Sequence, residues 1–180
     1  MEIVKFKPEY YNKVFTIYEK SFPAEERYIT LDKMIKQENT ELYCLVNEEE
    51  VLGFVYLIFC DNMIFILYLA VDTDNRSKGY GSYILKWCLN KYMDKNIYLN
   101  IEEVKKESRD YETRLKRLKF YLNNDFFITN YISKEETESF NILSNNREID
   151  IEQYKELDKF VAIILDEPIS NIVKVDIKEI

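Results

Sequence analysis

Hydrophobic positions along the chain follow two patterns, one typical of buried strands and one typical of helices with a single buried face. Short, almost uninterrupted apolar runs rich in β-branched and aromatic residues predict strands; they cover residues 2–6, 41–46, 51–59, 63–71, 97–101 and 126–131, with a weaker run at 139–143. Apolar residues three and four positions apart predict helices; they cover residues 8–22, 30–36, 79–92, 110–123 and 151–165. This order of elements favours the α+β class with a mixed sheet.

Prolines, a threonine and short polar segments mark where these elements begin and end. Pro8 suits the first turn of a helix, Pro23 ends that helix, and Thr30 is a candidate N-cap for the next one. Polar turns at 47–50 and 60–62 join three strands into an antiparallel meander. Because these strands are almost wholly apolar, we expect the meander to be central and covered on both faces.

The last predicted helix has the clearest apolar stripe. Its inward positions are Tyr154, Leu157, Val161 and Ile164. Pro168 should end this helix, because proline cannot continue the helical hydrogen-bond pattern. We expect the remaining residues to form an edge strand or no regular structure.

Composition and charge exclude several classes of protein. A length of 180 residues predicts one domain. The formal net charge is 25 − 33 = −8, which disfavours nucleic acid as a partner and suits a cationic substrate. Histidine is absent, so Ser-His-Asp sites, Cys-His sites and histidine-ligated metals are excluded. Three scattered cysteines predict neither a disulfide framework nor a metal site.

The chain shows no feature of a membrane or secreted protein. Residues 1–11 lack the apolar core of a signal peptide. The most apolar stretch, residues 51–71, is interrupted by Asp61 and Asn62 and suits two strands better than a membrane span. We therefore expect a cytoplasmic protein without a membrane partner.

The segment with the most specific chemistry follows the third strand of the meander. It runs from Leu69 into a predicted helix and contains Arg76, Lys78 and two of the three glycines, Gly79 and Gly81. Unpaired N–H groups at a helix start attract anions, and glycines allow a phosphate to approach the backbone closely. The phosphate loop GxxxxGK[ST] and the dinucleotide motif GxGxxG are both absent, so these two kinds of nucleotide site are disfavoured.

Two motifs in this element order resemble the GNAT superfamily of N-acetyltransferases. The first is the Arg-x-x-Gly-x-Gly that begins at Arg76, and the second is residues 117–126, which resemble the family's R-x-x-F-Y-x-x-x-G-F. The resemblance implies a mixed, centrally splayed sheet flanked by helices, here with an extra C-terminal helix. It implies an acetyl-CoA-binding catalytic core at 1–131, with 132–180 as a strand and helix extension packed on the same domain.

The resemblance also implies a role for each part of the loop. The expected pyrophosphate-binding residues are Arg76, Ser77, Lys78, Gly79, Tyr80, Gly81 and Ser82. The expected pantetheine-binding strand is Leu69, Ala70 and Val71, and the Val71 N–H would polarise the thioester carbonyl, as an oxyanion hole does. No metal is implied.

Candidate acid–base residues come from the same resemblance. Tyr121 is the expected general acid toward the departing CoA thiolate, and Glu102, at the end of a strand, is the expected base, directly or through water. Glu25 and Glu26 lie where the family has a substrate-lining loop. A solvated surface position is the alternative for each of the three glutamates, and among 33 acidic residues it is the more common situation.

Two positions depart from the family pattern. Ser77 stands where the family often has glycine, and the serine keeps the backbone N–H. Asp125 stands at the glycine that ends a helix; Asn124 or Asp125 is expected to adopt the left-handed conformation there. The departure at Ser77 is expected to be harmless, and the departure at Asp125 is expected to cost a little stability without loss of function.

The resemblance favours an acetyl-CoA-dependent N-acetyltransferase that acts on a primary amine by direct transfer in a ternary complex. Cys44, Cys60 and Cys88 are expected to be structural rather than acyl carriers. The acceptor is expected to be cationic, such as a polyamine, an aminoglycoside-like amine, an amino acid or a protein N-terminus. A homodimer is compatible with this interpretation. Two alternatives stay open: a non-catalytic acyl-CoA sensor, and an interaction protein with a vestigial loop.

Overall fold

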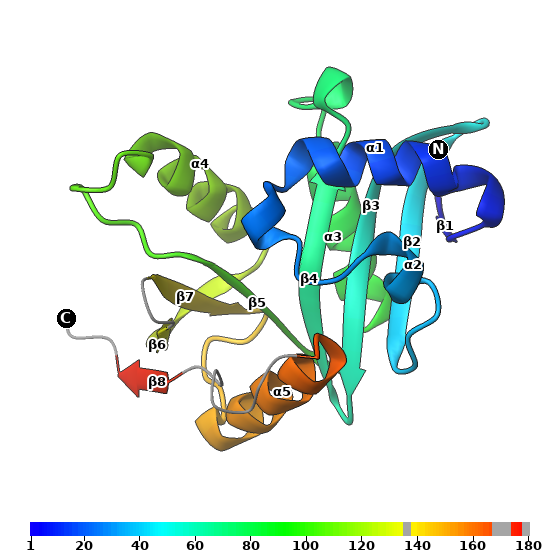
Figure 1. Ribbon diagram of the computed structural model, residues 1–180. Coiled ribbons are helices and arrows are strands. Elements are labelled where there is room, and N and C mark those ends of the chain that lie inside the picture. Colours follow the sequence, from blue (N-terminus) through cyan, green and yellow to red (C-terminus); the bar gives the residue numbers. More distant parts are fainter. Residues whose placement is uncertain (135–137, 167–173, 178–180) are drawn as a thin grey trace. The chain divides into compact units, whose positions relative to one another are not determined.

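The computed structural model describes residues 1–134, 138–166 and 174–177 (Figure 1). The chain divides into two compact units, and each is described by itself. The first consists of Met1–Phe59 and Ile66–Met93, and the second of Cys60–Phe65 and Asp94–Ile180. No helix within the described ranges is long and apolar enough to cross a bilayer.

The first unit contains most of the predicted meander. Its strands are β1 (Glu2–Lys5), β2 (Thr40–Asn47), β3 (Glu50–Cys60) and β4 (Met63–Val71), and its helices are α1 (Tyr11–Ser21), α2 (Leu31–Met34) and α3 (Tyr80–Lys91). Single 3₁₀ turns lie at Pro8–Tyr10, Ala24–Glu26 and Thr73–Asn75. The strand order is β1-β2-β3-β4, and the first two pairings are antiparallel.

Helices cover both faces of this part of the sheet, as the uninterrupted apolar runs predict. Tyr18 of α1 packs on Phe54 of β3 and Tyr68 of β4, at ring centroid distances of 6.3 and 5.1 Å. On the opposite face, Tyr43 of β2 contacts Trp87 of α3 at 4.6 Å. Figure 1 shows α1 and α2 in front of these strands and α3 behind them.

The second unit continues the sheet from the first residues of β4. Its strands are β5 (Asn96–Glu102), β6 (Phe127–Lys134), β7 (Ser139–Ser144) and β8 (Lys174–Ile177), and its helices are α4 (Tyr111–Leu122) and α5 (Ile151–Ile164). The order is β4-β5-β7-β6-β8; β4 and β5 are parallel, and the other pairs are antiparallel.

The parallel ladder between β4 and β5 is short. It pairs Met63, Ile64 and Phe65 with Asn96, Ile97 and Tyr98. Both strands continue beyond this ladder, β4 to Val71 and β5 to Glu102.

The predicted elements and the α+β class are confirmed, with local differences. Thr30 caps α2 by accepting a hydrogen bond from the Lys33 N–H, but α2 ends at Met34, two residues earlier than predicted. The weak strand at 139–143 is not peripheral, since β7 pairs with β5 on one side and β6 on the other.

The two C-terminal helices differ in how deeply they pack. The four predicted inward residues of α5 are all buried, whereas α4 has no fully buried residue. The edge-strand alternative for the last residues holds for β8, which pairs with β6. Pro168 lies outside the described residues. The division of the chain at 131 stays a prediction, and it falls within β6.

Candidate active site

The start of α3 presents backbone N–H groups that the helix itself does not use. The first helical bond runs from the Tyr83 N–H to the Gly79 carbonyl, with an N···O distance of 3.0 Å. The N–H groups of Tyr80, Gly81 and Ser82 precede that bond, as at any helix N-terminus. These three residues are half-buried, and residues 76–79 are exposed.

Two residues of the loop have left-handed backbone conformations that set its shape. Gly79 has φ = 83° and Ser77 has φ = 62°. Glycine adopts such angles freely, whereas a residue with a Cβ pays about 1–2 kcal/mol. This explains why glycine suits position 77 in similar loops. Serine at this position was expected to be harmless, but its left-handed backbone adds a cost in stability that the expectation left out.

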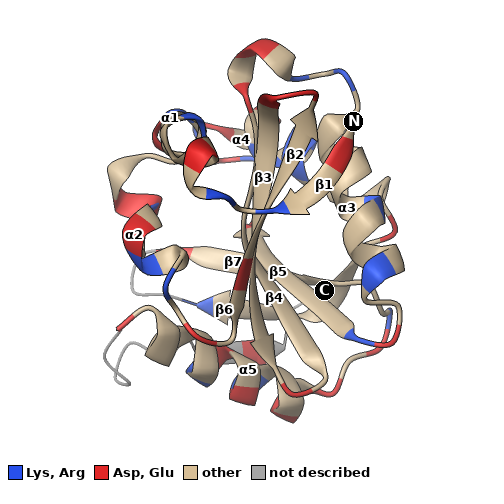
Figure 2. Ribbon diagram, turned by 90° about the vertical axis from the view of Figure 1, so that its right-hand side faces the viewer, with Lys and Arg blue, Asp and Glu red and all other residues tan. Residues whose placement is uncertain are grey.

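The two cations of the loop are exposed, and the charged end of each side chain is hydrogen-bonded to a neighbouring residue. The Arg76 guanidinium donates to the Val71 carbonyl at 3.3 Å and to the Ser21 hydroxyl at 3.2 Å. Lys78 Nζ donates to Asn75 Oδ1 at 2.8 Å. Figure 2 shows basic and acidic positions interspersed along the ribbon.

Strand β4, which leads into the loop, lies so close to β3 that only glycine fits at position 53. The sequence-based predictions assign no role to this glycine. A Cβ on Gly53 of β3 would lie 2.6 Å from the Ala70 carbonyl oxygen and 3.3 Å from Val71 Cα. The Leu45–Val46 register shift beside Gly53 marks a bulge in the β2–β3 ladder. An isolated glycine within a strand pattern is the available signal of such a close approach.

A buried hydroxyl holds the segment after α1 against β4. Tyr68 Oη accepts from the Tyr28 N–H at 2.9 Å and donates to the Glu26 carbonyl at 3.0 Å. Tyr18 Oη lies 3.3 Å from Tyr68 Oη and donates to the Ile29 carbonyl at 2.7 Å. Burial raises the pKa of both tyrosines, so both hydroxyls keep the protons they donate.

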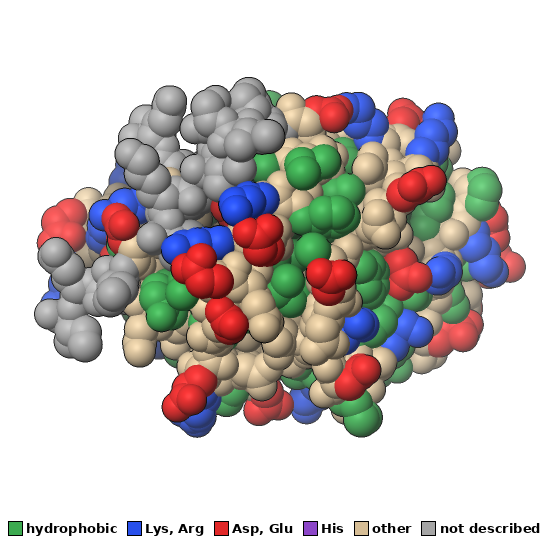
Figure 3. Space-filling model, turned by 90° about the horizontal axis from the view of Figure 1, so that it is seen from below, with side chains coloured by type: hydrophobic (Ala, Val, Ile, Leu, Met, Phe, Trp, Pro, Cys, Tyr) green, Lys and Arg blue, Asp and Glu red, His purple; other side chains and the backbone are tan. Residues whose placement is uncertain are grey.

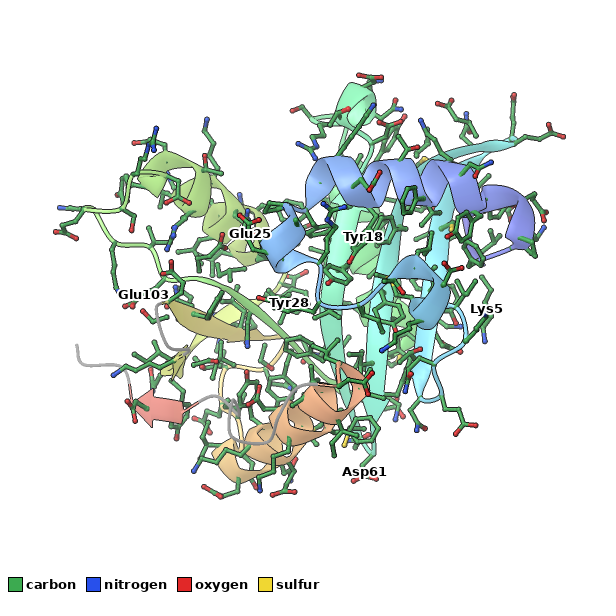
Figure 4. All side chains as sticks on the ribbon, in the orientation of Figure 1. Lys5, Tyr18, Glu25, Tyr28, Asp61 and Glu103 are labelled. Atoms are coloured by element: carbon green, nitrogen blue, oxygen red, sulfur yellow. The ribbon has the colours of Figure 1, made fainter. Side chains whose placement is uncertain are left out.

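The residues predicted to line the site of the amine acceptor lie on this anchored segment. Glu25 and Tyr28 are exposed, and Glu26 is half-buried. Figure 4 shows Glu25 and Tyr28 on the connection that follows α1, with Tyr18 beneath that helix. The backbone of Glu26 is therefore held against Tyr68, the β4 residue that immediately precedes Leu69, and Glu25 is its exposed neighbour in the chain.

We predict that Tyr68→Phe lowers the free energy of unfolding by about 1–3 kcal/mol. The substitution keeps the ring but leaves the Glu26 carbonyl and the Tyr28 N–H without this buried partner. Urea unfolding would measure the loss. Tyr56→Phe is the matched control, because Tyr56 is also buried and stacks on the Tyr68 ring but makes neither of these bonds. An equal loss in both variants would contradict the anchoring role.

In the second unit, the candidate base is paired with an arginine. Glu102 is the last residue of β5, and its Oε2 accepts from the Arg117 guanidinium of α4. The Glu102 side chain is 17% exposed and that of Arg117 is 40% exposed, so the pair is partly screened from water. In the sequence Arg117 is only the first residue of a motif, and no local pattern predicts its contact with Glu102.

Tyr121 lies one helical turn after Arg117 on α4, and both charges of the pair influence it. Its half-buried ring packs against Phe120 and Phe126 at centroid distances of 5.1 and 6.0 Å. Burial raises the pKa of Tyr121 to about 12; the charge of Arg117 acts against this and that of Glu102 reinforces it. The Tyr121 phenol is therefore protonated at neutral pH, as a general acid must be.

The end of α4 fixes the position of Tyr121. The Tyr121 carbonyl accepts from the Asn124 N–H at 2.9 Å and from the Phe126 N–H at 3.2 Å. Asp125, at φ = 62°, makes this turn possible. The expectation that Asn124 or Asp125 takes the left-handed conformation is thus confirmed for Asp125.

The cysteines and acidic residues do not form a nucleophile or metal centre in the described part of the chain. Cys44 and Cys88 are buried, and burial raises the pKa of each thiol to about 12. Cys60 is half-buried, with a pKa raised by burial. Among the described residues, no three histidine, cysteine or carboxylate side chains cluster as metal ligands would.

Sequence comparison identifies the family to which these features belong. The profile of the acetyltransferase (GNAT) family matches residues 8–115, more than half of the chain. The chain belongs to the GNAT family of acetyltransferases and is an acyltransferase. No curated protein sequence gives a significant match.

Solved structures agree on the fold. A protein described as a GNAT-family acetyltransferase from Bacteroides thetaiotaomicron is 18% identical, with a TM-score of 0.70, covering 97% of this chain and 100% of that one. An aminoglycoside 6'-N-acetyltransferase complexed with coenzyme A is 14% identical, with a TM-score of 0.63 and coverages of 83% and 100%. A chimeric spermidine N-acetyltransferase from Vibrio cholerae and hSSAT is 12% identical, with a TM-score of 0.62 and coverages of 79% and 93%.

Proposed function

We propose that this acyltransferase moves an acetyl group from acetyl-CoA to a primary amine. The observation that carries the proposal is the start of α3, where unused N–H groups and exposed cations follow strand β4. Helix N-termini of this kind bind phosphate groups. The similarity of the fold to a structure that holds coenzyme A supports the same donor here.

Each part of the loop then has a role in holding the donor. Residues 76–82 bind the pyrophosphate, with N–H groups from the helix start and charge from Arg76 and Lys78. Leu69, Ala70 and Val71 pair with the pantetheine arm, and the Val71 N–H polarises the thioester carbonyl. Gly53 keeps β3 close enough to β4 to fix the backbone of this strand.

An ammonium acceptor must lose two protons from its nitrogen, and the CoA thiolate must gain one. The first proton passes to Glu102, directly or through water, which frees the nitrogen to attack the thioester carbon. The second proton leaves to water once the carbon–nitrogen bond has formed. When the carbon–sulfur bond breaks, Tyr121 donates a hydrogen bond and then its proton to the CoA sulfur. The products are an N-acetyl amine and CoA with a free thiol. No cysteine carries the acetyl group in this direct transfer.

The acceptor is proposed to be cationic. The chain carries a net charge of −8, and Glu25 and Glu26 lie on the segment anchored by Tyr68. Negative charge attracts amines in their ammonium form and speeds their arrival. Acetylation of an aminoglycoside and of spermidine by proteins of similar fold fits an amine acceptor.

The proposal is tested by incubating the purified protein with acetyl-CoA and a panel of amines while measuring the release of free thiol. The panel should contain a polyamine, an aminoglycoside, amino acids and a peptide with a free N-terminus. We expect at least one amine to release free thiol faster than acetyl-CoA is hydrolysed without an amine. Mass spectrometry should detect the acetylated form of that amine. Binding of acetyl-CoA without turnover of any amine would favour the sensor alternative.

We predict that Glu102→Gln lowers kcat/KM about 100-fold at pH 7, which is the scale of general-base catalysis. The ratio to the wild type should approach one at high pH, where the free amine no longer needs a base. A pH profile of both proteins gives the measurement. Glu103→Gln is the control, because the Glu103 carboxylate instead accepts from Ser139 and pairs with Lys105. A constant ratio across pH would remove Glu102 as the base.

A further inference from the structure

A cavity lies in the first unit, away from the loop that we assign to acetyl-CoA. It has a volume of about 560 Å³ and is lined by residues of β1, β2, β3 and the end of α3, among them Lys5, Glu41 and Lys91. Figure 4 shows Lys5 at the β1 side of these strands. The loop that we assign to acetyl-CoA lies at the start of α3 and this cavity at its end, so the 12-residue helix separates them by about 18 Å.

Aromatic rings surround an ammonium group at this cavity. Lys91 Nζ lies 5.6, 5.4 and 5.5 Å from the ring centroids of Tyr43, Trp87 and Tyr92. Each distance is within the range of a cation–π interaction. The Tyr43 and Trp87 rings meet edge to face at 4.6 Å, and Phe59 packs on Tyr92 at 5.4 Å. We call the rings of Tyr43, Trp87 and Tyr92 the aromatic box.

A carboxylate orients two of the three rings. Glu41 Oε2 accepts from the hydroxyls of Tyr43 at 2.7 Å and Tyr92 at 2.8 Å, and Oε1 pairs with Lys5 at 2.7 Å. Burial disfavours the charged carboxylate, but these three donors outweigh it and lower the pKa of Glu41. The Glu41 carboxylate therefore lies behind the two tyrosines and fixes their rings through the hydroxyls, while Lys5 balances its charge.

The ammonium group of Lys91 is the part of this arrangement that another cation could replace. It is the last residue of α3 and is exposed. Within the described residues its ammonium has ring contacts and no ion pair. Exposed cation–π contacts are individually weak, so another ammonium group can compete with it.

We propose that the aromatic box is a binding site for a small organic amine, whose ammonium group takes the place of Lys91 Nζ. The site is separate from the acetyl-transfer machinery and requires no reaction. Lys91 acts as a tethered competitor, so its side chain sets the amine concentration at which the site fills. The net charge of −8 favours cationic ligands over anions.

The single tryptophan of the chain, Trp87, makes a direct test possible. Tryptophan fluorescence is followed while the protein is titrated with tetramethylammonium chloride or 1,4-diaminobutane, with sodium chloride at equal ionic strength as the blank. We expect Lys91→Ala to show a saturable change with an affinity at least about tenfold above that of the wild type, because a tethered competitor acts at roughly millimolar effective concentration. Lys86→Ala, also exposed on α3, is the matched control and should behave as the wild type.

Three results would overturn the proposal. One is the absence of a saturable change in Lys91→Ala. Another is an equal gain in Lys86→Ala, which would indicate a general effect of removing a lysine. The third is a saturable response to sodium acetate that Lys91→Ala abolishes, since that would make the cavity an anion site between Lys5 and Lys91. The readout does not use acetyl-CoA, so failure here leaves the proposed acetyl transfer unaffected.

Discussion

Tyr121→Phe is expected to reduce kcat by about 100-fold or more while the affinity for acetyl-CoA stays unchanged. Phenylalanine keeps the packing against Phe120 and Phe126 but has no proton to give to the departing sulfur. General acid catalysis commonly contributes about 10²–10⁴-fold. Steady-state thiol release gives kcat, and calorimetry gives the affinity for acetyl-CoA.

The raised pKa of Tyr121 sets the pH range in which it can act as the acid. Because burial raises the pKa of Tyr121 to about 12, the phenol stays protonated up to roughly pH 11. Its ionisation should therefore cause no loss of wild-type activity between pH 7 and about pH 10. Tyr111→Phe on the same helix is the control and should keep full turnover. A Tyr121→Phe enzyme with normal kcat would show that another group protonates the thiolate.

Gly79→Val is expected to weaken acetyl-CoA binding by about tenfold or more. A Cβ at this position meets no atom within 4 Å, so steric clash is not the reason. The reason is φ = 83°, which a β-branched residue adopts only with strain. Relief of that strain would turn the N–H groups of Tyr80, Gly81 and Ser82 away from the pyrophosphate. Tenfold corresponds to about 1.4 kcal/mol.

Gly79→Asn separates the effect of backbone strain at position 79 from the effect of adding a side chain there. Asparagine tolerates the left-handed conformation and fills the same open space. It should bind acetyl-CoA almost as well as the wild type, whereas Gly79→Val should not; calorimetric titration of all three proteins makes the comparison. Full affinity in Gly79→Val would contradict the assignment of this loop to the pyrophosphate.

Elements with strong local signals were predicted well from the sequence. β4 begins and ends at the predicted residues, 63 and 71, because an apolar run bounded by polar residues leaves little choice. Thr30 caps α2, and the α5 stripe is buried, because capping and helical spacing are local properties. The weak run at 139–143 was harder, since its strand is stabilised by two distant partners, β5 and β6.

The site was only partly accessible from the sequence, because several of its features depend on residues far apart in the chain. The loop and Tyr121 were found through motifs that resemble a family. The contact of Gly53 with Ala70, the pairing of Glu102 with Arg117, and the bonds of Tyr68 to the segment before α2 each join positions that no local pattern connects. The distribution of charge also gives little indication of where the site lies, since acidic and basic side chains are interspersed over the face in Figure 3.

The most direct test of the central claim is thermal unfolding with and without acetyl-CoA, with ATP and NAD as controls. At 100 times the dissociation constant, a ligand of the native state adds about 2.7 kcal/mol of stability. For a protein of this size, each kcal/mol raises Tm by about 2–4 °C. The proposed function predicts a rise of about 5–11 °C with acetyl-CoA and none with the controls. An unchanged Tm at saturating acetyl-CoA would contradict it and favour the interaction-protein alternative.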